Sequence, residues 1–459
     1  AGASDVSETG DMARFACDLR YEDLPEELLA LLRRSFLDTI GVAAIGATTE
    51  MARCARRAAQ ALFGAGSAGT ARVLMDGTAL SPVGAAMAGA FTVDAVDAHD
   101  GSTPNKGHAG SAVFPALLAV ADAKRTQERA MNGAAFAAHL AVAYEVSYRA
   151  GQAQHATTPD YHTSGSWTST GVAVAVARML GADADQIAHA AGIGEYHGPR
   201  SQMMRCIDHP TMLRDGVGWG APSGVSAGYL AVAGFTGAPA QTCESEGFWG
   251  DLGSEWWTVR DTHYKPYPCC RWAHPAIDAV QELMKDRSLN HQHIASVDIR
   301  TFHYATRLAG HRPTRLDEFS YGIAFPVATM IVRGQLGPEE LRPEVLQDPD
   351  ICRISQATRL IDDPVLTARS VKQRWAGVTL YSTDGRAFAA EPRTPRGDAD
   401  QPMIDAEISK KFHLFADSTL GANRADRIEA LAGRFDQLDS DDFNELLDLC
   451  AIPPAGTSI

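Results

Sequence analysis

The segment Tyr264–His274 places basic side chains on a stretch of chain that proline makes stiff. Lys265 is followed by Pro266, and proline both fixes its own φ and pushes the preceding residue toward extended geometry. A lysine held in this way near Arg271 and His274, once desolvated, could serve as an acid, a base or a clamp for a carboxylate. A surface turn that leads into a helix is the structural alternative, so this segment by itself does not establish a site.

A second group of polar residues lies far upstream, in residues 94–110. Asp97, His99, Lys106 and His108 stand there between two apolar runs that predict buried helices. A loop rich in Asp, His, Lys and Gly between core helices is expected to carry function. The acids and histidines are also candidate metal ligands, but their spacing fits no zinc pattern and no cysteine lies nearby, so we predict no metal.

Seven segments, in order along the chain, resemble the MmgE/PrpD family: 35–41, 97–119, 143–146, 161–171, 234–237, 265–269 and 395–412. The resemblance implies an enzyme that acts on a small di- or tricarboxylic acid without a metal or an organic cofactor. Its chemistry would be proton removal or delivery at a carbon next to a carboxylate. The implied fold is a helical domain with a lid.

The resemblance also carries catalytic roles, motif by motif, to Asp97, His108, His162 and Lys265. We predict Lys265 or His162 as the base and His108 as the acid, with Asp97 holding His108 and fixing its tautomer. Each positioned proton transfer is typically worth about 10²- to 10⁴-fold in rate. Substrate carboxylates are expected to meet a further set of residues: Arg214, His274, Arg271, His99 and Lys106.

Three departures from the family pattern leave the reaction open. Residues 97–101 read Asp-Ala-His-Asp-Gly where the pattern is Asp-x-Asp-Asp-Thr, so His99 replaces an acid and the threonine is missing. Arg214 stands where relatives have a lysine; it keeps the charge but is a poor proton shuttle. The tyrosine expected after residue 320 falls at Ile323, with Tyr321 two residues earlier.

Dehydration is the reaction we place first, with epimerisation and decarboxylation of a similar polycarboxylate as alternatives. A protein that binds polycarboxylates but has lost the chemistry is an alternative of another class. The sequence Gly-Val-Ser-Ala-Gly at 224–228 also fits the nucleophile elbow of serine hydrolases, but no hydrophobic strand precedes it and an Ala-rich segment follows. Close packing of a helix through small residues explains this motif better.

The composition predicts a large cytoplasmic enzyme. A chain of 459 residues with 45% hydrophobic and 21% charged residues can bury a large core in two or more domains. The net charge of −15 argues against a nucleic-acid partner and requires a locally basic pocket for an anionic substrate. Neither a membrane span nor a signal peptide is predicted, and the eight scattered cysteines suit a reducing compartment. A homodimer is expected from the large apolar helix faces and from the resemblance.

The expected fold class is mainly α, with a large all-helical domain and an inserted smaller α+β lid domain. Residues 1–262 are assigned to the helical domain, which residues 391–459 complete, and residues 263–390 to the lid. The cleft between these domains would put Lys265 at the hinge, close to the loop 97–108. Hydrophobic periodicity predicts helices at 25–45, 133–149, 169–180, 273–286 and 321–333, and strands at 294–302, 370–381 and 386–390.

Overall fold

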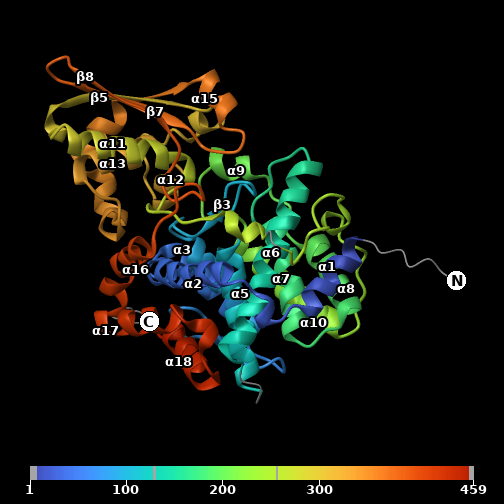
Figure 1. Cartoon of the computed structure of the whole chain (residues 1–459). Helices are drawn as coiled ribbons and strands as arrows, with labels where there is room; N and C mark the ends of the chain where they lie inside the picture. Colours follow the sequence, from blue (N-terminus) through green and yellow to red (C-terminus); the bar gives the residue numbers. More distant parts are fainter. Residues whose placement is uncertain (1–7, 128–130, 255–256, 454–459) are drawn as a thin grey trace.

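Helices dominate the computed structural model of the chain, which describes residues 8–127, 131–254 and 257–453 (Figure 1). The fold class is therefore mainly α, as the sequence predicts. No helix within these residues is both long enough and apolar enough to cross a membrane.

The first part of the chain packs as a layered set of helices. Short two-stranded pairs interrupt it at β1 (Ala71–Arg72) with β2 (Ala79–Leu80), and at β3 (Gly101–Ser102) with β4 (Thr262–His263). The prediction of an all-helical domain missed both pairs, because two-residue strands carry no periodic signal. The helices are α1 (Glu8–Asp18), α2 (Glu26–Gly46), α3 (Glu50–Leu62), α4 (Pro82–Asp94), α5 (Gly110–Arg125), α6 (Gly133–Thr157), α7 (Gly165–Met179), α8 (Ala184–His197), α9 (Met203–Asp208) and α10 (Val217–Val232).

Small residues let α6, α7 and α10 approach one another closely. A Cβ added at Gly171 of α7 would lie 1.8 Å from the Ser147 hydroxyl of α6, and one at Gly224 of α10 would lie 2.6 Å from the Val172 side chain of α7. Residues 224–228 therefore sit inside a packed helix, and the Ser226 hydroxyl donates to the carbonyl of Pro222 (2.8 Å). This geometry rules out a nucleophile elbow at this motif.

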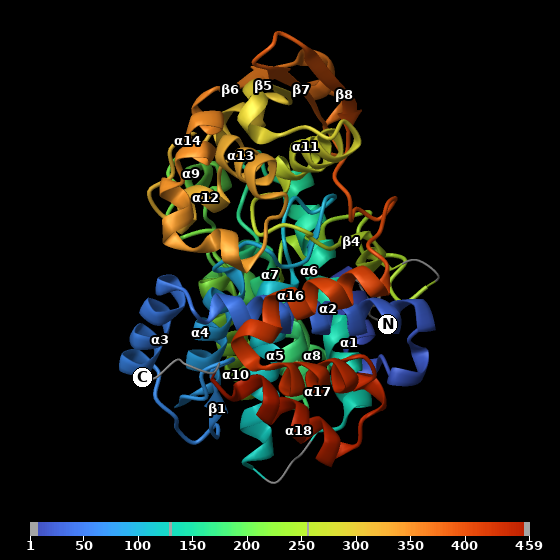
Figure 2. The same cartoon turned by 90° about the vertical axis from the view of Figure 1, so that its left-hand side faces the viewer.

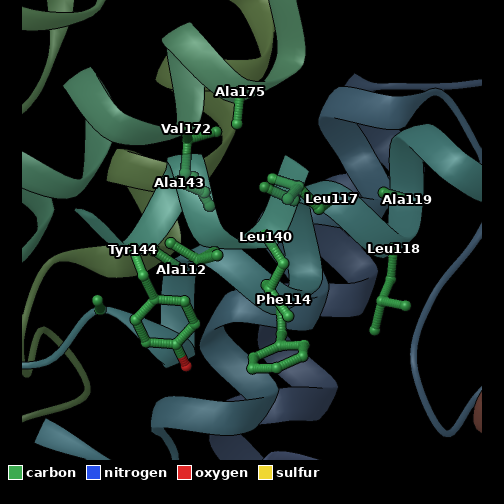
Figure 3. Close-up of a cluster of buried hydrophobic side chains, with 14 of the residues drawn as sticks. Ala112, Phe114, Leu117, Leu118, Ala119, Leu140, Ala143, Tyr144, Val172 and Ala175 are labelled. Carbon is green, nitrogen blue, oxygen red and sulfur yellow. The ribbon is translucent and has the colours of Figure 1, made fainter. Parts of the chain in front are cut away.

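Large side chains fill the space beside these close contacts. Figure 3 shows Phe114 of α5 next to Leu140 of α6, with Tyr144 one helical turn further along α6 and Val172 on the neighbouring α7. The rings of Phe36 and Phe114 meet edge to face with their centroids 5.2 Å apart. These residues are fully buried, and they anchor the helices that carry the loop 94–110 at their ends.

Four strands of the described chain form one mixed sheet in the order β6-β5-β7-β8. Strand β5 runs parallel to β6 and antiparallel to β7, and β8 is antiparallel to β7. Helices α11 and α13 lie between this sheet and the helical body (Figure 2). The elements are α11 (His274–Asp286), β5 (Ile294–Thr301), α12 (Leu316–Ser320), α13 (Ala324–Arg333), α14 (Pro349–Gln356), β6 (Thr358–Asp362), α15 (Pro364–Arg369), β7 (Ala376–Ser382) and β8 (Ala387–Arg393).

The predicted strands and helices of this part are largely present, with two shifted starts, while α12, α14, α15 and β6 were not predicted. The strand expected from residue 370 begins at Ala376, because α15 and a turn occupy the residues before it. The helix expected from Tyr321 begins at Ala324. Strand β6 was not predicted, since a five-residue strand directly after a helix shows too few alternations to be recognised.

The buried apolar side chains of the described residues form two clusters. One joins the first helices to three C-terminal ones, α16 (Asp405–Leu420), α17 (Ala422–Ala432) and α18 (Ser440–Ala451). The other surrounds α11, α13 and the sheet, and it includes Met203 and Ile207 of α9. Helix α9 thus packs with the second cluster although it precedes residue 263. The outermost residues assigned to the helical domain, 1–7 and 454–459, lie outside the described residues.

Candidate active site

Strands β3 and β4 join the polar loop to the lysine arm. Gly101 pairs with His263 across the two strands, and this pairing places Lys265 beside the loop. A Cβ at Gly101 would lie 2.6 Å from Nδ1 of His108 and 2.7 Å from Nε2 of His263. Gly101 stands where the family pattern has threonine, and the two imidazoles occupy the space that a threonine side chain would need.

Lys265 and Asp97 form a buried ion pair at the centre of this junction. The Lys265 ammonium donates to Asp97 Oδ1 at 2.6 Å and to the Asp97 carbonyl at 3.0 Å. Asp97 presents both oxygens because its backbone is left-handed, with φ of 53°, a conformation that non-glycine residues rarely adopt. The ion pair therefore fixes the position of the Lys265 side chain. The prediction that Asp97 orients His108 is wrong, because Asp97 is committed to Lys265.

The carbonyl of Asp100 fixes the tautomer of His108. Nδ1 of His108 lies 2.7 Å from that carbonyl oxygen, which can only accept, so Nδ1 carries the hydrogen. Nε2 then has a free lone pair and faces Asp215 Oδ2 at 3.7 Å. Burial, reinforced by the positive charges of His99 and Lys265, lowers the pKa of His108 well below its ordinary value. His108 is thus in the form of a base, whereas the sequence predicted an acid.

The carboxyl group of Asp215 has a raised pKa, in contrast to the lowered pKa of His108. It is buried at the start of the turn before α10, and its Oδ2 has no hydrogen-bond partner among the described residues. Burial, and then the negative charges of Asp94 and Asp97, raise the pKa of this carboxyl well above its ordinary range. Asp215 was not among the predicted site residues. Its position directly after Arg214, where relatives place a site lysine, was the available signal.

His99 lies behind the cavity rather than in its wall. Its Nε2 contacts Asp94 Oδ1 at 3.0 Å and lies 3.7 Å from Asp97 and 3.8 Å from Asp215. Burial opposes the charged imidazole, but the hydrogen bond to Asp94 and the surrounding carboxylates raise the pKa of His99 above its ordinary value. His99 therefore supplies positive charge to three buried acids, and the prediction that it binds substrate does not fit this position.

Asp97, His108, Asp215 and Lys265 border a small cavity that is partly open to solvent and has a volume of about 40 Å³. Four cationic side chains are among the described residues that line it: Lys106, Lys265, Arg271 and Arg374. Arg374 comes from the turn before β7 and was not predicted. Burial lowers its pKa only relative to that of an ordinary arginine, so it remains a cation.

Several polar atoms of the cavity wall have no partner in the described part of the chain: Asp215 Oδ2, His263 Nε2, Arg271 Nε and the Tyr321 hydroxyl. Buried polar groups without a hydrogen bond are uncommon and costly, and each calls for an explanation. Their gathering at one cavity indicates a place for a polar ligand. Tyr321 was considered from the sequence, whereas His263 was not predicted.

His274 does not line the cavity, but it holds the side chain of Arg271, which does. Its Nε2 donates to the Cys269 carbonyl at 2.9 Å, which leaves Nδ1 to accept from the Arg271 guanidinium at 2.9 Å. Asp398 accepts a second hydrogen bond from Arg271 at 2.6 Å. The guanidinium is thereby fixed with its Nε free at the cavity. The predicted direct contact of His274 with substrate is replaced by this supporting position.

Two other predicted residues lie outside the cavity lining. Arg214 is 1% exposed and donates to Asp317 Oδ1 of α12 at 2.8 Å. The Nδ1 of His162 donates to the Asp160 carbonyl at 2.9 Å. Its neighbour Tyr161 lines the cavity instead and donates its hydroxyl to the Lys106 carbonyl. In this conformation both Arg214 and His162 lie outside the cavity lining, and their predicted roles stay predictions.

Two overlapping groups have the residue types to hold a metal ion: Asp97 with His99 and His108, and Asp94 with His99 and Asp215. In each group the candidate ligand atoms lie within 4.8 Å of one another. However, Asp97 already binds the Lys265 ammonium, and both nitrogens of His99 face acceptors. The groups therefore contain their own cations, and we assign no metal to them.

Comparison with known proteins places the chain in a family. Residues 10–255 match the MmgE/PrpD N-terminal domain, and residues 267–437 match the MmgE/PrpD C-terminal domain. The chain therefore belongs to the MmgE/PrpD family. Lys265 lies in the short stretch, residues 256–266, between the two matches.

The curated relatives are similar over nearly their whole length. A cis-aconitate decarboxylase of Aspergillus terreus (strain NIH 2624 / FGSC A1156) is 22% identical, over 97% of this chain and 96% of the relative. A second cis-aconitate decarboxylase from Aspergillus terreus is 23% identical over the same shares. A cis-aconitate decarboxylase-like protein of Aspergillus oryzae is also 23% identical, over 92% of this chain and 93% of the relative.

Proposed function

We propose that this protein is a cofactor-independent lyase that acts on a small di- or tricarboxylic acid through proton transfer next to a carboxylate. One observation carries the proposal: cationic side chains and unpartnered buried polar atoms converge on one cavity beside a neutral histidine and a protonated carboxyl. Family membership and relatives named as decarboxylases support the same class of chemistry.

The cations account for the binding of an acid. The chain carries a net charge of −15, so an anionic substrate meets repulsion everywhere except at a local concentration of positive charge. Lys265 and Arg271 are each anchored by one carboxylate and keep their orientation without substrate. Such preorganised charges stabilise negative charge that develops in the transition state.

His108 and Asp215 each carry out one of the two proton transfers. His108 Nε2 takes the proton from the carbon next to a substrate carboxylate, and the electron pair of that C–H bond forms the new double bond. Asp215 then gives its proton to the hydroxyl that leaves as water. With ordinary pKa values, at a pH between the two, the histidine would be protonated and the carboxyl ionised. Here the pKa of His108 is lowered and the pKa of Asp215 is raised, so the histidine can accept a proton and the carboxyl can donate one.

Decarboxylation is the second candidate, favoured by the names of the relatives. In that reaction the bond between carbon and carboxylate breaks, carbon dioxide leaves, and the carbon receives a proton from Asp215. The same cations would hold the remaining carboxylates. Epimerisation stays a third alternative, and it requires a second base on the opposite face of the substrate.

We further propose that residues 263–390 act as a lid domain on the helical domain. Pockets for small molecules usually have volumes of about 300–1,000 Å³. The cavity of about 40 Å³ is far smaller, so a citrate-sized acid enters only when the two sides separate. Arg271, Tyr321 and Arg374 would then move with the lid, and Asp97 and His108 with the helical body.

Proton NMR in D₂O tests the proposal with a panel of citrate, 2-methylcitrate, aconitate, malate and tartrate. Loss of the signal of the hydrogen next to the carboxylate, with new vinyl signals, indicates dehydration; exchange without vinyl signals indicates epimerisation; and released carbon dioxide indicates decarboxylation. His108→Gln should abolish the reaction, while His303→Gln, a change of the same type at an exposed histidine, should not. Binding of these acids without exchange in any of them would support the non-catalytic alternative.

A further inference from the structure

A second, larger hollow lies beside the catalytic cavity, with a volume of about 860 Å³. It is bordered by α3, α4, α9 and the start of α10, and it shares no lining residue with the cavity described above. Its volume falls within the usual range for sites that bind small molecules. We call it the α3–α10 groove.

The walls of the α3–α10 groove are apolar along most of its length. Met51 and Ala55 come from α3, Met87 and Phe91 from α4, and Trp219 from α10. The Trp219 side chain is half exposed, although a large apolar surface of this kind normally seeks cover. This wall suits an aliphatic or aromatic group rather than another polar acid.

Arginines supply all the ionised side chains among the described residues that line this groove: Arg205, Arg214 and Arg315. No carboxylate is among those lining residues, in a chain whose net charge is −15. The three arginines come from different elements, α9, the turn before α10, and the residue that precedes α12. An anion in this groove would therefore meet positive charge from three separate segments of the chain.

The arginines also have donors to spare. Arg214 donates one nitrogen to Asp317, and its buried Nε and Nη1 have no partner among the described residues. Arg315 donates to the Pro210 carbonyl at 3.1 Å and lies 3.4 Å from Glu318. The Arg205 side chain has neither a hydrogen bond nor an ion pair within the described residues. A carboxylate accepts from such guanidinium groups with two oxygens at once.

We propose that the α3–α10 groove is a second ligand site, which binds a carboxylate with an apolar tail. The carboxylate lies at the arginine end, and the tail lies along Met51, Met87 and Phe91. The ligand is a monocarboxylate of the fatty-acid or aryl-acid type, since no described lining residue other than these arginines carries a charge that would pair with a second carboxylate. The site adjoins the reaction centre, because Arg214 directly precedes Asp215 and its guanidinium lies 5.7 Å from the ring centre of Tyr321.

Cys54 provides a direct assay, because this exposed free cysteine lines the groove. The full chain is labelled with a small maleimide, and modification of Cys54 is followed by mass spectrometry with octanoate, acetate or octanamide present. Octanoate should slow the labelling of Cys54 at least fivefold, whereas acetate lacks the tail and octanamide lacks the charge. Cys352, a partly buried cysteine of the second cluster, is the internal control and should react at an unchanged rate.

Two variants separate the site from an unspecific effect. Arg205→Gln removes one charged hydrogen-bond donor at an exposed position and should weaken octanoate binding about tenfold. Ala58→Phe adds bulk to the groove wall and should abolish protection, while circular dichroism reports an intact fold. Equal protection of Cys352, or unchanged octanoate affinity in Arg205→Gln, would overturn the proposal. Protection of Cys54 that rises with protein concentration without ligand would instead assign the groove to a second copy of the chain.

Discussion

Replacement of Asp215 by asparagine is the sharpest test of the proposed chemistry. The amide has the shape of the carboxyl group but cannot deliver a proton. If Asp215 is the acid, kcat should fall by about 10²- to 10⁴-fold, the usual contribution of one positioned proton transfer. The wild-type carboxyl is proposed to be protonated and neutral, so the substitution leaves the charge of the cavity unchanged.

Substrate affinity therefore distinguishes a protonated Asp215 from an ionised one. With a neutral carboxyl, the Kd of the substrate should change less than threefold in Asp215→Asn. With an ionised carboxyl, removal of its charge would relieve a repulsion of about 4 kcal/mol between unit charges 4 Å apart at an effective dielectric constant of about 20. That amount corresponds to a gain in affinity of nearly a thousandfold.

The assay combines calorimetric binding of the substrate found by NMR with initial rates measured from pH 5 to pH 10. In the wild type the lowered pKa of His108 should move the acid limb of the rate profile below 6.5, and the raised pKa of Asp215 should produce a limb on the alkaline side. The alkaline limb should vanish in Asp215→Asn. A kcat within threefold of the wild type, or a large gain in affinity, would refute the assigned role.

Three further predictions concern stability and the shape of the site. Lys265→Met should lower the free energy of unfolding by about 3–5 kcal/mol, because Asp97 would remain buried without its counter-ion; adding Asp97→Asn should restore most of the loss in urea titrations, and no recovery would contradict the pairing. Gly101→Thr should reduce kcat at least tenfold by displacing the His108 imidazole, whereas Gly101→Ser with full activity would show that the site tolerates a Cβ there. Burial and the charge of a neighbouring arginine hold the pKa of His274 well below its unfolded value, so its contribution is complete above pH 6.5 and is lost as the pH falls toward the folded pKa; urea titrations at pH 7 and pH 5 should show a loss of up to about 1.4 kcal/mol per pH unit, smaller in His274→Gln.

Local pattern was sufficient for several of the longer elements. Helix α2 and strand β5 repeat their hydrophobic period and were expected within one residue of their bounds. Helices α6 and α7 were also expected, but with ends up to eight residues away from those observed. The same reasoning failed where an element is short or is created by pairing. Strand β6 and the two-residue strands β3 and β4 exist only because distant backbone lies beside them.

The sequence by itself indicated the segments in which the proposed active site lies. Proline fixes the backbone around Lys265 locally, and the polar loop 94–110 differs in composition from the helices on either side, so both segments stand out without any knowledge of the fold. The family followed from the order of such segments along the chain, and the family comparisons confirm it.

Only the tertiary structure decided how those residues are arranged. The partner of Asp97 and the raised pKa of Asp215 both depend on atoms contributed by segments more than a hundred residues apart. The nitrogen of His108 that carries the hydrogen is set within its own loop, by the carbonyl of Asp100. Arg374 joins the site from the turn before β7, again from a distant part of the chain. Hydrogen bonds and desolvation act between atoms that lie a few ångströms apart in space, and the linear sequence does not give these distances.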